Sequence, residues 1–222
     1  MSTERGTIVR HAGTVLVGQL AVMAFGITDT VVAGRFADTA LAALSVGSAT
    51  YITVHISLMG MLQALLPVWA ELHGANKNAA VGQSVRQALY LCMLTALIGM
   101  TALAFPGPLL NWTQVPEALQ AEVRTYLLIV ALGIPASLMF RMYSTLNQSL
   151  GKPKLVTWVQ VGALAVKIPL SIVLVLGIPG VLPPLGLAGC AWATLAVNYL
   201  MLGLALWLLR TQDFYRPYRI WA

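Results

Sequence analysis

The sequence predicts an all-α, polytopic membrane protein built from six transmembrane helices. Of its 222 residues, 59% are hydrophobic and only 9% are charged, whereas soluble domains average about 25% charged residues. Several apolar runs reach the roughly 20 residues that a helix needs to cross a bilayer. When six spans are counted, most basic residues fall on one side of the membrane, and an odd number of spans would scramble this pattern.

Gly, Pro and charged residues separate the apolar runs. The predicted spans are residues 11–33, 42–67, 85–105, 123–144, 156–178 and 187–209. No A-x-A-like cleavage site follows a short apolar core, so the first run is expected to be an uncleaved helix. We expect one six-helix domain over residues 1–210. Residues 211–222 form a basic and aromatic tail, which suits an anionic membrane surface better than a nucleic acid.

The distribution of basic residues predicts the orientation of the chain. Ten of the 13 Lys and Arg residues share one side of the membrane: Arg5, Arg10, Lys77, Arg86, Arg141, Lys152, Lys154, Arg210, Arg216 and Arg219. The positive-inside rule therefore places both termini in the cytoplasm. Trp69, Trp112, Trp158, Trp192 and Trp207 fall near span ends, as interfacial aromatics do.

Asp29 is an acid within the first apolar run. A carboxylate near the centre of a membrane helix costs about 2.5–3.5 kcal/mol on insertion scales. Such a residue usually faces protein or water, and it marks an ion site or a transport pathway. The alternative is a buried acid that pairs with a base for assembly alone.

Lys167 is the other charge well inside a span. It lies 13 residues after Lys154, or roughly 20 Å along the helix, and Asp29 lies 19 residues after Arg10, or roughly 28 Å. The lysine stem could bring its ammonium group close to the depth of Asp29, although depth does not show that the two share a face. Ser171 follows one turn after Lys167, on the same helical face.

Polar residues also line one face of the second span. Ser48, Tyr51, His55 and Gln63 follow helical offsets, which predicts a cavity wall or a helix contact. His55 is either a proton carrier or a hydrogen-bonded core residue. On the first helix, Gln19 is a further candidate polar neighbour of Asp29. Cys92 and Cys190 lie inside apolar runs and are expected to be free core residues.

Three motifs, in this order, resemble the multidrug and toxic compound extrusion (MATE) family, and most closely its bacterial NorM-like branch. They are Asp29-Thr-Val-Val-Ala-Gly34, Asn147-Gln148…Gly151-Lys-Pro153 and Gly186-x-x-Gly189-Cys-Ala-x-Ala-Thr194. The resemblance implies twelve helices in two six-helix lobes, of which this chain resembles the N-terminal one. Residues 211–222 would then begin the linker between the lobes. The chain would lie in a bacterial inner membrane with a second lobe as its partner.

The resemblance also implies a function. It suggests a secondary antiporter, or half of one, that exports organic cations in exchange for H⁺ or Na⁺ by alternating access. In the family the acid that matches Asp29 is implicated in ion coupling, and the fifth helix often carries two polar residues, commonly asparagines. Here Lys167 and Ser171 match those positions, and the lysine favours H⁺ because it occupies the place of a Na⁺. Gln19, Tyr51 and His55 complete the expected site.

Other functions fit less of the sequence. A truncated or split, non-transporting subunit is one alternative, and a flippase of lipid-linked oligosaccharides from the same superfamily is another. An enzyme is not expected, since the sequence lacks paired intramembrane acids, a G-x-S-x-G-like context, a phosphate loop and metal-ligand spacing. No cofactor or nucleic acid is expected either.

Overall fold

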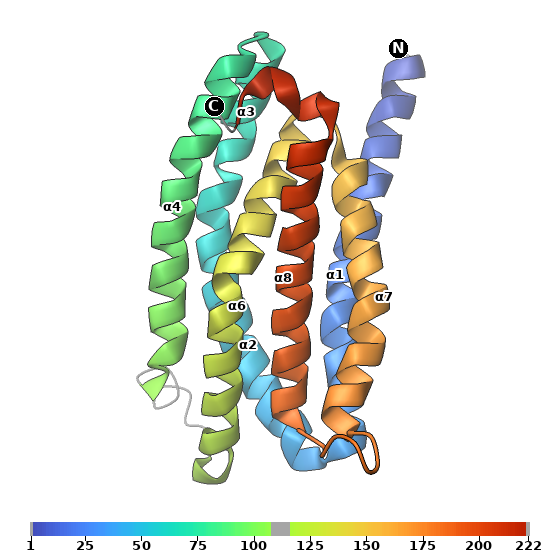
Figure 1. Cartoon of the computed structure of the whole chain (residues 1–222), viewed down its shortest axis with the longest axis vertical. Coiled ribbons are helices and arrows are strands. Elements are labelled where there is room, and N and C mark those ends of the chain that lie inside the picture. The colour runs from blue at the N-terminus through green and yellow to red at the C-terminus, as the bar shows by residue number, and fades with distance from the viewer. Residues whose placement is uncertain (1, 108–115, 221–222) are drawn as a thin grey trace.

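Long α-helices make up nearly all of the chain that the computed structural model describes, which is residues 2–107 and 116–220 (Figure 1). A single 3₁₀ helix, η1, follows the last α-helix. The helices are α1 Ser2–Phe36, α2 Asp38–Gln63, α3 Leu65–Gly74, α4 Asn78–Ala104, α6 Glu117–Ser149, α7 Pro153–Leu176, α8 Leu187–Thr211 and η1 Asp213–Tyr218.

Six helical segments in this part of the chain are long and apolar enough to cross a membrane, with α2 and α3 together forming one of them. The predicted six-span, all-α fold is therefore confirmed. The chain ends that Figure 1 marks lie at the same end of the bundle. We call this the terminal end, and the other the far end.

The helices extend beyond the spans that hydropathy predicts. Residues 70–84 were expected to form a loop, but only Ala75, Asn76 and Lys77 separate α3 from α4. Hydropathy marks the hydrocarbon layer, whereas backbone hydrogen bonds continue the helix into the polar interface. The turns are set locally: Pro153 opens α7, where its missing N–H costs nothing, and Gly177 ends that helix with a φ of 74°.

Helix α6 lies at the centre of the bundle and carries much of its core. It packs against α8, α2 and α4, while α1 packs mainly against α7. Pro135 lies inside α6 without ending it. The hydroxyl of Tyr199 on α8 donates a hydrogen bond to the carbonyl of Leu132 at 3.1 Å, next to the carbonyl that Pro135 leaves without a helical donor.

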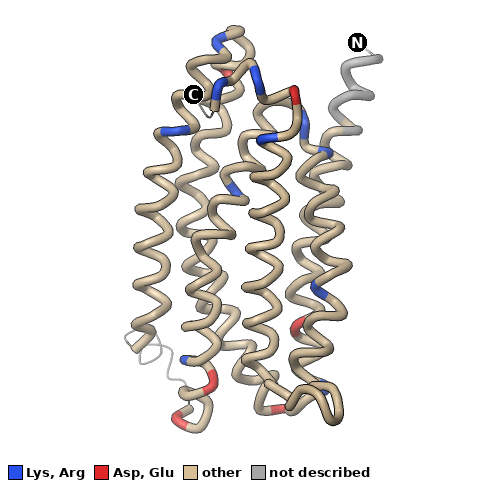
Figure 2. The backbone as a smooth tube through the Cα atoms, viewed as in Figure 1, with Lys and Arg blue, Asp and Glu red and all other residues tan. Residues whose placement is uncertain are grey.

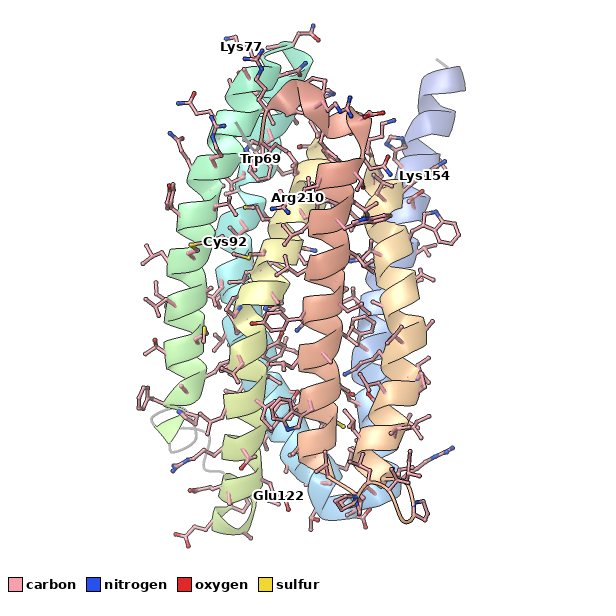
Figure 3. The ribbon with its side chains drawn as sticks, in the orientation of Figure 1. Trp69, Lys77, Cys92, Glu122, Lys154 and Arg210 are labelled. Atoms are coloured by element: carbon pink, nitrogen blue, oxygen red, sulfur yellow. The ribbon has the colours of Figure 1, made fainter. Side chains whose placement is uncertain are left out.

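The outer surface suits a lipid environment along the length of the bundle. Large apolar side chains are exposed on α1 and α4, and Trp158, Trp192 and Trp207 are exposed as well. Figure 2 shows that charged residues gather near the two ends of the bundle. In Figure 3, Lys77 and Lys154 lie toward the terminal end and Glu122 at the far end.

Two of the tryptophans expected at a membrane interface are Trp69 and Trp112. Trp69 is not an exposed interfacial residue, because it is fully buried and its Nε1 donates to Ser84 Oγ at 3.0 Å. Its large ring fills the space where α3 meets α4 instead of facing headgroups. Trp112, also expected at an interface, lies outside the described residues.

The segment after α8 folds back onto the bundle. The hydroxyl of Tyr215 donates to Asn147 Oδ1 at 2.7 Å, and Tyr218 pairs with His73 Nδ1 at 3.2 Å. Arg86 donates to the carbonyl of Arg219 at 3.0 Å. Burial raises the pKa of Tyr215 above its usual value, so this phenol stays a neutral donor. The aromatic side chains that suggested a membrane-binding tail thus pack against the protein.

Candidate functional site

A buried ion pair joins α1 to α7. The Nζ of Lys167 lies 2.9 Å from Oδ2 of Asp29, and the two side chains are 0% and 10% exposed. The sequence predicted that Asp29 and Lys167 reach a similar depth in the membrane, and in the structure the two side chains are in direct contact. The two helices pack along each other, which holds the acid and the base in register.

Two hydroxyl groups complete the surroundings of the pair. Ser171 Oγ donates to Asp29 Oδ1 at 3.2 Å. Thr194 Oγ1 accepts a bond from Lys167 Nζ at 2.5 Å and lies 3.4 Å from Asp29 Oδ2. Its single proton is directed either to Asp29 or to the carbonyl of Cys190, 2.9 Å away. Each carboxylate oxygen therefore has at least one donor.

Close packing of α7 and α8 brings Thr194 to the pair. A Cβ on Gly189 would lie 2.6 Å from the carbonyl oxygen of Leu174, so only glycine fits this approach. Lys167 and Ser171 are four residues apart on α7 and therefore share the face that meets α1 and α8. The free thiol of Cys190, one turn before Thr194, lies 3.9 Å from the carbonyl of Asp29.

The chemistry available here is that of a carboxylate held by an internal cation. The ammonium of Lys167 and the hydroxyls of Ser171 and Thr194 surround the Asp29 carboxylate, so the positive charge beside it comes from the protein itself. Protonation of Asp29 would remove the attraction that ties α1 to α7. Across residues 2–107 and 116–220, no group of three His, Cys, Asp or Glu side chains could hold a metal ion.

The other predicted site residues lie apart from this pair. Gln19 is ten residues before Asp29, or roughly 15 Å along α1, and it lines a small pocket of about 10 Å³ with Gln148 and Gln160. Tyr51 and His55 lie on α2 and stack at 5.4 Å between ring centroids. Tyr51 lies near Ser137 of α6 and Asn198 of α8, so it faces a different helix junction.

Three residues near Asp29 were not proposed from the sequence: Thr194, Cys190 and Tyr126. Thr194 and Cys190 belong to the motif that opens the sixth span, from which no contact with Asp29 was predicted. Tyr126 is buried against Gly47 and lies within electrostatic range of Asp29 and Tyr51. The depth of Thr194 in its helix, compared with that of Lys167, was the signal that could have found it.

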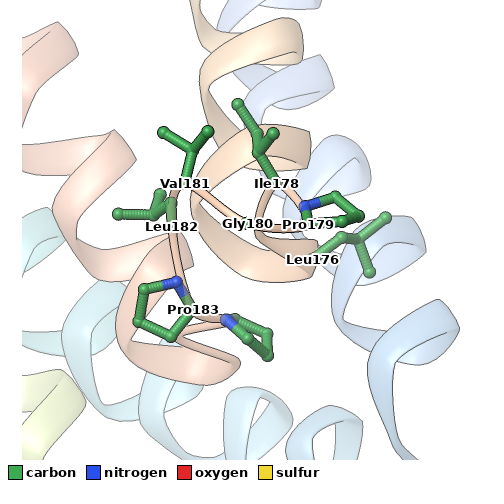
Figure 4. Close-up of a pocket in the computed structure, with 8 residues that line it drawn as sticks. Leu176, Ile178, Pro179, Gly180, Val181, Leu182 and Pro183 are labelled. Atoms are coloured by element: carbon green, nitrogen blue, oxygen red, sulfur yellow. The ribbon is translucent and has the colours of Figure 1, made fainter.

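A hollow at the far end lies apart from this site. A hollow of about 470 Å³ is lined by residues 176, 178–184 at the far end, where the turn between α7 and α8 curls on itself (Figure 4). Its lining carries no charged or titratable side chain. Neither this hollow nor the pocket beside Gln19 includes Asp29, which is 7% exposed. Both side chains of the ion pair are buried, with exposed fractions of 0% for Lys167 and 10% for Asp29.

Six apolar helices that enclose an acid–base pair define a multi-pass membrane protein with a charged site between its helices. The chain belongs to the MATE family, because the family model MatE matches residues 15–173. This family consists of transporters rather than enzymes, and its match confirms the resemblance seen in the three motifs.

Relatives agree in sequence and in fold. The chain is 40% identical over 220 residues to the probable multidrug resistance protein NorM of Aromatoleum aromaticum, covering 99% of this chain and 47% of the relative. The structure of the Vibrio cholerae MATE transporter VcmN in the bent form matches with a TM-score of 0.86 at 19% identity, covering 97% of this chain and 49% of that one.

A third match is the MATE transporter NorM-NG, solved in complex with R6G and a monobody. It has a TM-score of 0.75 and 31% identity, over 93% of this chain and 45% of that one. The chain thus spans about half the length of the relatives it matches, which corresponds to one six-helix lobe of the MATE fold.

Proposed function

We propose that the chain acts as the N-terminal lobe of a secondary antiporter that exports organic cations in exchange for H⁺. The observation that carries this proposal is the buried Asp29–Lys167 pair, with Nζ and Oδ2 2.9 Å apart. Burying a charge pair between three membrane helices costs desolvation free energy that apolar side chains of the same size would avoid. Charged residues inside membrane spans usually mark an ion or substrate pathway.

The mechanism follows from the contacts of Asp29. While ionised, the carboxylate ties α1 to α7 through Lys167 and Ser171, and to α8 through Thr194. Protonation from the outer side would loosen α1 and allow the helices to rearrange. If the rearranged state binds the organic cation less tightly, proton entry and substrate release are coupled, as linkage requires. Lys167 fills the place where Na⁺ would sit, which favours H⁺.

The proposal includes orientation and partners. Basic residues gather at the terminal end, so we place both termini in the cytoplasm and the protein in a bacterial inner membrane. A second six-helix lobe would complete the substrate chamber. The relatives are about twice as long as this chain. The second candidate function is therefore that of a split subunit that transports only together with a partner chain.

The test is Asp29→Asn in a drug-sensitive bacterial host that also produces a second lobe. We expect loss of the drug resistance that the assembled transporter confers, with unchanged abundance in the membrane, because Asn cannot exchange a proton. R6G is a suitable first substrate. The matched control is Asp38→Asn, which changes an exposed acid at the start of α2. Full resistance in Asp29→Asn would remove this residue from the mechanism, and equal loss in both variants would point to folding.

A further inference from the structure

Three glutamine side chains from three helices line the small pocket toward the terminal end of the bundle. Gln19 comes from α1, Gln148 from the last turn of α6 and Gln160 from α7. Thr157 and Pro153 of α7 also line it, and its volume is about 10 Å³. We call it the glutamine pocket. Neither Gln19 nor Gln148, which belongs to the turn motif between α6 and α7, has a part in the Asp29 site.

The amide of Gln160 is buried against α1. The residue is 4% exposed, and its Oε1 lies so close to the backbone of α1 that a Cβ on Gly18 would collide with it. Within residues 2–107 and 116–220, this amide has no hydrogen-bond partner. A buried amide that lacks hydrogen bonds is costly, and proteins normally satisfy it with protein groups or ordered water.

The glutamine pocket has the size and the chemistry that a single water needs. A volume of about 10–15 Å³ admits one water, which usually makes about three hydrogen bonds. The amides of Gln19 and Gln160 offer donors and acceptors. Gln148 keeps its Oε1 free, since its Nε2 donates to Ser144 Oγ at 3.1 Å. The hydroxyl of Thr157 donates to a carbonyl of α1 at 2.8 Å and can still accept. Because no lining side chain is charged, the pocket suits a neutral ligand better than an ion.

We propose that one buried water occupies the glutamine pocket and joins α1 to α6 and α7. Helix α1 is then attached to α7 at two points, which lie ten residues or roughly 15 Å apart between Gln19 and Asp29. Only the second point, the Asp29–Lys167 pair, consists of charged groups. The water itself does not depend on the proposed transport function. Within that function, it would keep the terminal part of α1 in place when protonation of Asp29 frees the rest.

X-ray hydroxyl-radical footprinting of the purified full chain in detergent tests for this water. X-rays split a bound water in place, so side chains beside it are oxidised even where bulk solvent does not reach. Val156 lines the pocket and is 3% exposed, whereas Val159 on the same helix is 7% exposed and lies outside the pocket. We expect Val156 to be oxidised several-fold faster than Val159, although Val159 is the more exposed of the two.

A double-mutant cycle tests whether the glutamines share the water. Gln148→Met and Gln160→Met each remove a partner and keep the length of the side chain. Each should raise the unfolding equilibrium constant about twofold to tenfold, as the loss of one hydrogen bond does. Because either change releases the water, the double variant should fall short of the product of the two effects. The matched control is Gln87→Met, an exposed residue of α4, whose effect should multiply with that of Gln160→Met.

Two results would overturn the inference: equal oxidation of Val156 and Val159, or a double variant whose effect equals the product of the single ones. Footprinting of the wild type needs no substitution, so it decides the question even if the methionine variants do not fold. Coupling that requires Na⁺ or K⁺ would place an ion in the pocket and would equally contradict a water. Neither measurement involves transport or Asp29, so failure of the antiport proposal leaves both readouts unchanged.

Discussion

At the scale of single residues, the Asp29–Lys167 pair is better explained by function than by stability. A buried pair gains little net free energy, because desolvation offsets the attraction, yet removing one partner typically costs about 3–5 kcal/mol. An apolar pair of similar volume would pack as well. Instead two charged side chains occupy this position, and the hydroxyls of Ser171 and Thr194 form hydrogen bonds with them.

The role of Lys167 as a built-in cation leads to a prediction about Na⁺. In Lys167→Asn the carboxylate keeps Ser171 and Thr194 but loses its positive partner, so the site becomes an oxygen-rich pocket of one negative charge. Hard cations prefer such ligands. We expect NaCl to raise the unfolding temperature of the purified variant and to leave wild type unchanged. At 100 times its Kd, a bound ion adds about 2.7 kcal/mol of stability.

Choline chloride at the same ionic strength is the control for this measurement, since it screens charge without entering a small site. The double variant Asp29→Asn with Lys167→Asn gives a second control, because it lacks the carboxylate. A rise in unfolding temperature with NaCl that persists in the double variant would contradict the view that Lys167 stands in for a cation at Asp29.

Sequence reasoning placed part of this site and missed part, for a geometric reason. Counting residues from helix ends gives depth, and the depths of Asp29 and Lys167 did correspond to contact. It does not give the direction in which each helix face points within the bundle. Gln19 and His55 were therefore grouped with Asp29 although they lie at other helix junctions, and Thr194 was overlooked. The roles assigned to all of these residues remain predictions.

At the scale of elements, the approach of α8 to α7 is what delivers Thr194 to the ion pair. The small residues Gly186, Gly189 and Ala193 suit a close helix contact, and a Cβ on Gly189 would meet the backbone at Leu174. The spans themselves could be predicted because each is a long apolar run. Their ends, and the folding of η1 onto the bundle, depend on polar and tertiary contacts that hydropathy does not encode.

Gly189→Ala tests this contact. A Cβ there would lie within 3 Å of backbone atoms at 174–175, which cannot move aside as a side chain would. We expect the free energy of unfolding to fall by about 1–3 kcal/mol, as overpacked sites do. Thermal or denaturant unfolding of the purified chain in detergent measures this change.

Gly203→Ala is the matched control, because the same substitution on the same helix meets nothing within 4 Å. It should be neutral or stabilise by up to about 1 kcal/mol through helix propensity. If the two alanine variants unfold alike, the close contact of α7 and α8 does not limit stability, and the delivery of Thr194 needs another explanation.

At the scale of the whole molecule, the lobe has two chemically different ends. Lys and Arg residues are more numerous toward the terminal end, whereas the far end carries Asp38, Glu117 and Glu122 beside Arg35 and Arg124 (Figure 2). Only this asymmetry determines orientation, since the six spans are similarly apolar. Translocating the basic end would oppose both the membrane potential and the attraction of anionic headgroups.

Cysteine labelling measures this orientation directly. Lys154 is exposed at the start of α7, and Val181 is exposed by 79% in the turn between α7 and α8. In a chain whose buried Cys92 and Cys190 are replaced by alanine, we expect an impermeant maleimide to label Val181→Cys on intact spheroplasts. Lys154→Cys should react only after the membrane is permeabilised. Thr39→Cys, exposed at the far end on α2, should behave like Val181→Cys. The reverse pattern would place the termini outside, and the inward proton path to Asp29 would then have to start from the terminal end.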